Sequence, residues 1–207
     1  MSDVDFIHRF VPGKEGSART LLLLHGTGAD EDDLIDLGHA LDPSAALLSP
    51  RGKVLENGRP RFFRRLAEGV FDEEDVIARA HELAQFVEQA AERYKIDIDH
   101  LVAVGYSNGA NIAAAMMLLG LAKFSEAVLL RAMVPLSQLP QLPDLQHTRV
   151  LISAGEFDPI ARVPIAKELA ELCRNAGAEV TLQLQSGGHE LTAGDVEAAR
   201  EWLGAAR

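Results

Sequence analysis

Three residues of this sequence have the side-chain types and the order needed for nucleophilic catalysis by serine. Ser107 lies in the motif G-Y-S-N-G, Asp158 in G-E-F-D-P and His189 in G-G-H-E. A serine hydroxyl needs a base that takes its proton and a carboxylate that orients this base. Serine, acid and histidine follow in this order in hydrolases whose serine sits on a nucleophile elbow. We therefore predict a catalytic triad of Ser107, Asp158 and His189.

The motif around Ser107 must lie on a tight turn between a strand and a helix if it is a nucleophile elbow. The sequence fits, because the apolar run Leu101–Val104 precedes the motif and a helix rich in alanine and methionine follows over Asn108–Gly120. Gly105 and Gly109 would be the positions where a Cβ atom collides with a neighbouring strand or helix. The alternative is that Ser107 only caps the helix.

Other residues compete for the acid and base roles but fit them less well. Glu156 is an alternative acid, although Asp158 lies further into the loop and is followed by Pro159, which fixes a turn. The competing histidines lie on helices, at strand entrances or near the amino terminus: His8, His39, His81, His100 and His147. His189 follows the last predicted strand, at the edge where the other two groups emerge, and is the favoured base.

The loop after the first buried strand could supply donors for a developing oxyanion. It reads L-H-G-T-G-A-D, and its two glycines let the backbone approach a ligand closely. We predict that the backbone N–H groups of Thr27 and Asn108 form the oxyanion hole; the alternative is an ordinary strand-to-helix turn. A phosphate site is disfavoured, because the loop has neither G-x-G-x-x-G nor a Walker lysine. No metal site is expected, since the acidic residues that follow suit the first turn of a helix capped by Asp30.

The elements that would position these groups alternate between strands and helices. Buried strands are predicted at Thr20–Leu24, Ala45–Leu48, Leu101–Val104, Ala127–Leu130, Val150–Ser153 and Val180–Leu184. Helices are predicted after Asp30, from Asp72 to Tyr94, over Asn108–Gly120, between Pro164 and Gly177, and over Leu191–Leu203. Short apolar strands joined through helices indicate an α/β fold, with a mostly parallel central sheet flanked by helices on both faces. The length favours a single domain over residues 1–207, with little chain left for a large cap.

Two segments lack a regular pattern, Ser49–Phe71 and Arg131–Thr148. Long loops at the carboxyl ends of parallel strands are where ligands bind, so we favour a functional role for at least one of them over plain connectors. The tentative substrate-binding residues lie in these segments: Phe62, Phe63, Arg64, Arg65 and Met133. Arginines beside phenylalanines, Arg61 among them, could recognise an anionic or aromatic substrate, although arginines on a solvated loop face are an equal alternative.

Charge and composition argue against several classes of function. The 207 residues carry a formal net charge of −11, which disfavours nucleic acid and anionic membranes as partners, since both need a basic face. The single cysteine, Cys173, rules out an intramolecular disulfide, fits a reducing compartment and lies on an apolar helical stripe typical of the core. The amino terminus has no apolar signal region, and the longest apolar run, Ile112–Ala122, is too short to span a bilayer. These features predict a cytoplasmic protein without a membrane span.

Four motifs in register carry a resemblance to a known family. H-G-T-G-A-D, G-Y-S-N-G-A-N, G-E-F-D-P-I and G-G-H-E resemble, in order and spacing, the carboxylesterase/phospholipase branch of the α/β-hydrolases. The chain is most similar to the MhqD-like bacterial hydrolases of this branch, which share P-R-G-K-V-L-E-N-G and R-F-F-R-R-L-A-E-G-V-F-D. The resemblance covers nearly the whole chain. It implies the α/β-hydrolase fold, Ser107 as nucleophile, Asp158 as acid, His189 as base, and Thr27 and Asn108 as oxyanion donors.

One departure from the family pattern concerns the residue after the nucleophile. Acyl-protein thioesterases of this branch typically carry glutamine there, whereas this chain has Asn108. Since the oxyanion hole uses a backbone N–H, the mechanism is retained, but the lipid substrates of those enzymes do not follow. The cysteine chemistry of the neighbouring dienelactone hydrolases is also disfavoured, because Cys173 is nowhere near the G-Y-S-N-G motif.

The sequence thus predicts a serine carboxylester hydrolase that acts on small or short-acyl esters through an acyl-enzyme, without a cofactor. Thioesterase or acyltransferase activity is an open alternative, because these reactions share the acyl-enzyme and differ in the leaving group or the acceptor. A catalytically silent ligand-binding protein on the same fold is a second alternative, which the complete triad argues against. A small-molecule ester is the expected partner, and a homodimer is consistent with base rates.

Overall fold

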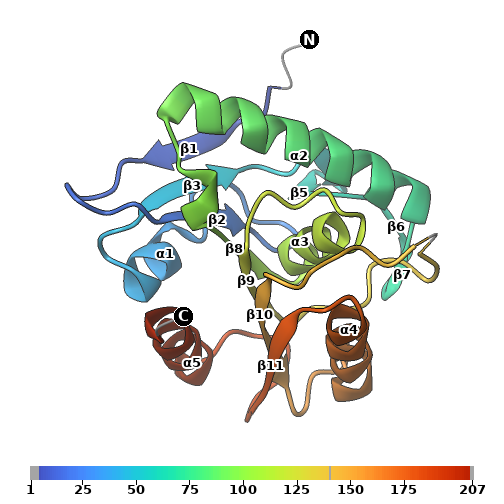
Figure 1. The fold of residues 1–207 in the computed structure, drawn as a ribbon. Helices are drawn as coiled ribbons and strands as arrows, with labels where there is room; N and C mark the ends of the chain where they lie inside the picture. Colours follow the sequence, from blue (N-terminus) through green and yellow to red (C-terminus); the bar gives the residue numbers. More distant parts are fainter. Residues whose placement is uncertain (1–4, 140, 206–207) are drawn as a thin grey trace.

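A computed structural model describes residues 5–139 and 141–205. In this part of the chain seven strands form one sheet, in the order β1-β3-β2-β8-β9-β10-β11 (Figure 1). Their bounds are β1 His8–Val11, β2 Thr20–Leu24, β3 Ala46–Pro50, β8 Leu101–Tyr106, β9 Glu126–Leu130, β10 Arg149–Gly155 and β11 Glu179–Gln185. Neighbouring strands run parallel, except that β1 pairs antiparallel with β3 at one edge. The predicted mostly parallel sheet is confirmed.

Helices cover both faces of this sheet. They are α1 Ile35–Leu41, α2 Glu73–Tyr94, α3 Asn108–Leu118, α4 Val163–Asn175 and α5 Ala193–Gly204, with a short 3-10 helix, η1, at Ile98–His100. Helices α1 and α5 pack on one face, and α2, α3 and α4 pack on the other (Figure 1). Because both faces are covered, β2 and β9 are buried along their whole lengths, which explains the apolar runs Leu21–Leu24 and Ala127–Leu130 within them.

Helices α2 and α3 form for reasons that the sequence already shows. The Asp72 side chain accepts a hydrogen bond from the backbone N–H of Asp75 and caps α2, and Lys95 ends this helix in a left-handed conformation. All eleven residues of α3 are buried, in agreement with the prediction of a central helix that is apolar nearly all round. The other predicted elements that occur have ends within about two residues of the predicted ones.

The helix predicted after Asp30 begins later than expected, at Ile35. The Asp30 side chain accepts a hydrogen bond from the backbone N–H of Asp32 at 3.0 Å, which closes a turn instead of a helical cap. Glu31 forms a two-pronged ion pair with Arg51 at the end of β3. The acidic residues therefore fix a turn and contact the sheet edge, and the prediction of a helix capped by Asp30 is wrong.

The segment Ser49–Phe71 was predicted to be irregular, and this prediction is wrong. It holds two small hairpins, β4 Val54–Glu56 with β5 Arg59–Arg61, and β6 Arg65–Ala67 with β7 Val70–Phe71. Asn57 and Gly58 join β4 to β5 with φ angles of 51° and 78°, the left-handed pair that suits a two-residue hairpin turn. The Asn-Gly dipeptide is a strong hairpin signal that the interpretation of an irregular loop overlooked.

The remaining sequence predictions about the fold concern a loop, an edge strand and the cysteine. The described residues of Arg131–Thr148 form neither helix nor strand, as expected. Strand β1 was not predicted, because its short and partly exposed sequence lacks a clear apolar pattern. Cys173 is fully buried in the core, as predicted, and burial raises the pKa of its thiol to about 11.

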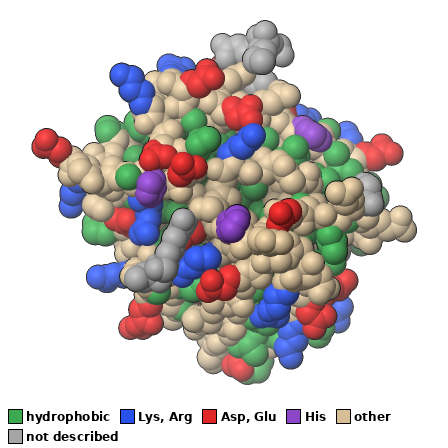
Figure 2. All heavy atoms as spheres, in the orientation of Figure 1, with side chains coloured by type: hydrophobic (Ala, Val, Ile, Leu, Met, Phe, Trp, Pro, Cys, Tyr) green, Lys and Arg blue, Asp and Glu red, His purple; other side chains and the backbone are tan. Residues whose placement is uncertain are grey.

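The described surface carries charges of both signs. Acidic and basic side chains are interspersed over the face drawn in Figure 2. Among the described residues, no helix combines the length and the apolar character needed to cross a membrane. No cap domain is present in this part of the chain, so the carboxyl edge of the sheet is bordered by the two hairpins and the loops that follow β9, β10 and β11.

Candidate active site

Ser107 lies on the turn that joins β8 to α3, with a φ of 51° and a ψ of −112°. This backbone conformation is strained for a residue other than glycine. A Cβ on Gly105 would lie 2.6 Å from the Ala110 Cα, and one on Gly109 only 1.8 Å from the Leu24 carbonyl oxygen, so close packing requires both glycines as predicted. The Ser107 side chain makes no capping hydrogen bond to α3, and the alternative of a simple helix cap therefore finds no support.

The structure brings the three predicted triad residues together at the carboxyl ends of β8, β10 and β11. The Ser107 Oγ lies 2.8 Å from the His189 Nε2, and the His189 Nδ1 lies 2.8 Å from the Asp158 Oδ2. A carboxylate only accepts hydrogen bonds, so the imidazole proton sits on Nδ1 and leaves Nε2 free to accept from the serine hydroxyl. This tautomer is the one that can take the serine proton.

Asp158 is a buried and well-anchored carboxylate. Its Oδ1 accepts hydrogen bonds from the backbone N–H groups of Ile160 and Ala161, at 2.8 and 2.9 Å, while its Oδ2 faces His189. The neighbouring Glu156, the alternative acid, is exposed. The geometry therefore favours Asp158 as the residue that orients the imidazole.

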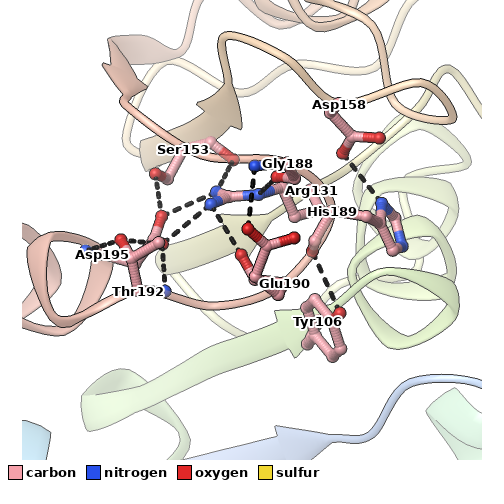
Figure 3. A network of polar contacts seen from close by, with 9 residues as sticks. All are labelled: Tyr106, Arg131, Ser153, Asp158, Gly188, His189, Glu190, Thr192 and Asp195. Atoms are coloured by element: carbon pink, nitrogen blue, oxygen red, sulfur yellow. Dashed lines mark hydrogen bonds and ion pairs between the residues drawn. The ribbon is translucent and has the colours of Figure 1, made fainter.

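Arg131 holds the loop that carries His189 from behind. Its Nε donates to the carbonyl oxygen of Gly188 at 2.8 Å, and its Nη2 donates to that of Glu190 at 3.0 Å, so the guanidinium grips the backbone on both sides of His189 (Figure 3). The same guanidinium forms a two-pronged ion pair with Asp195, at 2.7 and 2.8 Å. Both side chains of this pair are completely buried.

Asp195 connects this arginine to the start of α5. It accepts hydrogen bonds from the Ser153 hydroxyl and from both the backbone and the hydroxyl of Thr192, the residue that caps α5 (Figure 3). Burial by itself raises the pKa of the Asp195 carboxyl, but the hydrogen bonds from Arg131, Ser153 and Thr192 outweigh it and hold this pKa below its ordinary value. The carboxylate therefore stays charged beneath the histidine loop.

Tyr106 supports the same loop from the opposite side. Its hydroxyl donates to the backbone carbonyl of His189 at 3.0 Å (Figure 3). Burial raises the pKa of this phenol, so it remains a neutral donor over the whole working range of a hydrolase.

The predicted oxyanion donors Thr27 and Asn108 both line the pocket that contains Ser107. Neither backbone N–H donates a hydrogen bond within the described part of the chain, so both can serve a ligand. Buried His25 shapes the Thr27 loop: its Nδ1 donates to the Gly26 carbonyl at 2.7 Å, and its Nε2 accepts from the Gly52 N–H at 3.0 Å. Burial lowers the pKa of His25, which keeps the neutral form that these contacts require.

The first turn of α3 ties two loops to the site through asparagine side chains. The Asn108 Oδ1 accepts from the backbone N–H of Phe62 at 2.7 Å, and the Asn111 Oδ1 accepts from that of Met133 at 2.7 Å. Asn108 therefore has a structural role of its own, because it fixes the position of the hairpin segment relative to Ser107.

A pocket of about 250 Å³ opens above Ser107. Its lining contains the serine and histidine of the candidate triad, the two predicted oxyanion donors, and residues from both hairpins: Thr27, Arg59, Arg61, Arg65, Gly69, Phe71, Tyr106, Ser107, Asn108, Asn111, Arg131, Met133, Ile160 and His189. This volume lies below the usual range for sites that hold drug-sized ligands. The described residues contain no group of three or more His, Cys, Asp or Glu side chains placed to hold a metal ion.

The five tentative substrate-binding residues divide into two groups. Arg65 and Met133 line the pocket. Phe62 and Phe63 instead pack in the core, against His25 and Phe71 respectively. Arg64 forms ion pairs with Asp72 and Asp75. Phe62, Phe63 and Arg64 therefore lie outside the pocket lining. The physical reason is that burial of both aromatic rings fixes the backbone between the two hairpins. Because this backbone is fixed, Arg61 and Arg65 line the pocket and Arg64 does not.

Sequence reasoning missed several residues that the structure places at the site: Arg59, Tyr106, Asn111 and Arg131. Recognition of the Asn-Gly hairpin would have placed Arg59 and Arg61 side by side on one strand. No local signal marks Arg131, whose partners lie from 22 to 64 residues away in the sequence.

The sequence pattern of the phospholipase/carboxylesterase family matches residues 7–206. The chain belongs to this family. It is 47% identical over 189 residues to the Bacillus subtilis (strain 168) protein named "Putative hydrolase MhqD", with 91% of this chain and 94% of that protein covered. The expected family and the α/β-hydrolase fold are thereby confirmed.

Two solved structures of carboxylesterases are similar along almost their whole length. The Bacillus cereus carboxylesterase has 50% identity and a TM-score of 0.92, with 95% of this chain and 92% of that chain covered. The carboxylesterase from Mesorhizobium loti has 33% identity and a TM-score of 0.93, with 100% and 98% covered. The phospholipase/carboxylesterase family fold is therefore present here without a large insertion or deletion.

Proposed function

We propose that this member of the family is a serine carboxylester hydrolase that acts on small or short-acyl esters through an acyl-enzyme. The observation that carries the proposal is the hydrogen-bonded chain from Ser107 through His189 to Asp158, in which both contacts measure 2.8 Å. Ser107 itself lies on the strained turn after β8. A ligand-binding protein has no need of a serine held in this way. The similar carboxylesterases support the same chemistry.

The first half of the proposed reaction forms the acyl-enzyme. The Ser107 Oγ attacks the ester carbonyl carbon while the His189 Nε2 takes the hydroxyl proton, and Asp158 stabilises the imidazolium that results. The carbonyl oxygen becomes an oxyanion, which receives hydrogen bonds from the backbone N–H groups of Thr27 and Asn108. Collapse of the tetrahedral intermediate breaks the bond to the alcohol oxygen, and His189 returns its proton to the departing alcohol.

The second half releases the acid and restores the enzyme. A water molecule gives a proton to the His189 Nε2 as its oxygen attacks the acyl carbon, and the same oxyanion donors stabilise the second intermediate. Ser107 then leaves with the proton that His189 held. Small acyl groups are proposed because the pocket of about 250 Å³ has no long apolar channel among its described lining residues.

The test of this proposal is Ser107→Ala, measured on a short-chain p-nitrophenyl ester and with a fluorophosphonate probe. We expect kcat to fall by about a millionfold, to the background, because triad residues act as a unit, and we expect labelling to vanish. The control is Ser137→Ala, an exposed serine outside the pocket lining, which should keep both readouts. Wild-type turnover by Ser107→Ala would overturn the proposal, and a wild-type protein that resists the probe would favour the silent ligand-binding alternative.

Three further properties are proposed together with this activity. Thioesterase or acyltransferase activity would use the same acyl-enzyme. Competition of esters and thioesters against fluorophosphonate labelling of Ser107 tests the first, and transfer of the acyl group to an added alcohol in place of water tests the second. A cytoplasmic location is supported by the lone, unreactive Cys173. The single domain over residues 1–207 and the homodimer stay predictions, which limited proteolysis and light scattering would test.

A further inference from the structure

The pocket above Ser107 has a basic lining, although the whole chain carries a net charge of −11. The ionisable side chains among its described lining residues are one histidine, one tyrosine and four arginines. The arginines are Arg59, Arg61, Arg65 and Arg131. No aspartate or glutamate lines it. The positive charge is therefore gathered at the place where a substrate must lie.

Two carboxylates neutralise part of this charge from behind the lining. Asp195 pairs with Arg131, and Glu56 is shared by Arg61 and Arg65, each at 2.8 Å on a different carboxylate oxygen. The hydrogen bond from Arg65 has the largest effect on the pKa of Glu56 and lowers it. Burial opposes this effect, but the hydrogen bond from Arg61 and the charges of both arginines add to the lowering, so this pKa lies below its ordinary value. Glu56 is thus charged, and both of its oxygens are already engaged.

The Arg59 side chain has no hydrogen-bond or ion-pair partner within the described part of the chain, and Arg59 is exposed. Its side chain packs over Gly28, where an added Cβ would lie 3.3 Å from the Arg59 Cδ, and the Gly28 N–H donates to the Pro60 carbonyl at 2.9 Å. The hairpin and the oxyanion loop are therefore joined. This contact holds the free guanidinium of Arg59 beside the Thr27 loop.

Arg65 offers a second set of donors. Only its Nε is used by Glu56, and its side chain remains 31% exposed at the pocket. A guanidinium presents a planar fork of N–H donors that matches a carboxylate. The four arginines therefore have two carboxylate partners behind them, and Arg59 and Arg65 keep free donors toward the pocket.

We infer that the pocket selects small esters that carry a carboxylate of their own, which Arg59 and Arg65 bind while the ester carbonyl lies at Ser107. This inference rests on the proposed esterase function and adds the class of substrate. It also corrects the sequence-based choice of arginines, since Arg64 lies outside the pocket lining and Arg59 takes its place. No change in the chemistry of the triad is involved.

The test compares each acidic ester with a neutral ester of the same shape. Ethyl hydrogen succinate against ethyl 4-methylpentanoate places the charge on the acyl side, and acetoxyacetate against isobutyl acetate places it on the alcohol side. Hydrolysis is followed by proton release at constant pH 7.5 with the full-length protein. We expect at least one acidic ester to have a kcat/KM roughly ten- to a hundredfold above its neutral partner, because a charge-assisted hydrogen bond is worth about that much.

The variants are Arg59→Gln and Arg65→Gln, with Arg64→Gln as the matched control from the same segment. Each of the first two should lower kcat/KM for the preferred acidic ester about tenfold and leave the neutral ester within about twofold. Arg64→Gln should change neither. The preference should also weaken as the NaCl concentration rises, since salt screens exposed charges.

Failure of this inference and failure of the proposed function give different results. Equal kcat/KM for acidic and neutral esters, with turnover that Ser107→Ala abolishes, would overturn the carboxylate preference and leave the esterase standing. An equal loss for both ester types in Arg59→Gln and Arg65→Gln would also overturn it, because the arginines would then act through the fold. No Ser107-dependent turnover of any ester would refute the proposed function itself.

Discussion

The most demanding prediction concerns Arg131, which no catalytic motif contains. Arg131→Met keeps an unbranched apolar stem but removes the guanidinium. Five hydrogen bonds disappear: two to Asp195, and one each to the carbonyls of Gly188, Ser153 and Glu190. The change therefore affects the fold and the backbone on both sides of His189 at once.

The expected magnitude follows from the burial of the pair. Loss of one partner from a buried ion pair costs about 3–5 kcal/mol, because the other charge stays buried without compensation. For a protein of this size about 1 kcal/mol shifts Tm by about 2–4 °C, so Arg131→Met should melt roughly 6–20 °C below the wild type. A displacement of His189 by about 1 Å would lower kcat about a hundredfold.

A second variant separates these two effects. In Arg131→Met/Asp195→Asn the buried charge is gone, and the amide oxygen can still accept from Thr192 at the start of α5. The double variant should recover most of the lost Tm. It should not recover kcat, because the carbonyls of Gly188 and Glu190 still lack their donor and the histidine loop stays loose.

The assay measures kcat and KM on a neutral short-chain ester at a temperature well below the lowest Tm, with circular dichroism as proof of folding. The expected signature is a fall in kcat with little change in KM, and slower fluorophosphonate labelling of Ser107. Wild-type kcat in folded Arg131→Met would refute the positioning role. Recovery of both Tm and kcat in the double variant would show that the buried charge alone matters.

Two further predictions concern the turn and the pH dependence of stability. Gly109→Ala places a Cβ against the Leu24 carbonyl and should lower stability by about 1–3 kcal/mol or more with loss of turnover, whereas Gly204→Ala, which meets open space, should leave the melting curve unchanged. Burial lowers the pKa of His25 in the folded protein from 6.5, so the unfolded chain binds the proton first as the pH falls. The stability that neutral His25 contributes is therefore complete above about pH 6.5, and it is lost as the pH falls through the folded pKa. Urea unfolding at pH 7.5 and 5.5 measures how much free energy of unfolding is lost between the two pH values. This loss should be smaller for His25→Gln than for the wild type, and the exposed variant His39→Gln should lose as much as the wild type.

Patterns within short stretches predicted most of the fold. The apolar run of β2 reads as a buried strand because both faces of the sheet are covered, and α2 is marked by its own cap at Asp72. At the helix predicted after Asp30, the local pattern failed because two side chains had found other partners. Asp30 closes a turn and Glu31 binds Arg51, so the acidic run that resembles a helix start does not begin one.

The sequence alone also identified the three residues of the candidate triad, because the elbow glycines, the acid and the histidine each carry a local motif in a defined chain order. It could not show which arginines face the pocket. Their directions depend on how Phe62 and Phe63 pack, and on the bond from the Phe62 N–H to Asn108 across the site. Packing of this kind is a property of the assembled core and leaves no mark in local spacing.

What the sequence by itself determined is therefore the candidate chemistry: a serine at a predicted tight turn, with a histidine and an aspartate at the ends of later strands. What only the tertiary structure decided is the setting of that chemistry. Arg131 and Asp195 meet across sixty-four positions of the chain to hold the histidine loop. Arg59 and Arg65 come from separate hairpins to line one pocket, because the bond from the Phe62 N–H to Asn108 at the start of α3 holds the segment between them there.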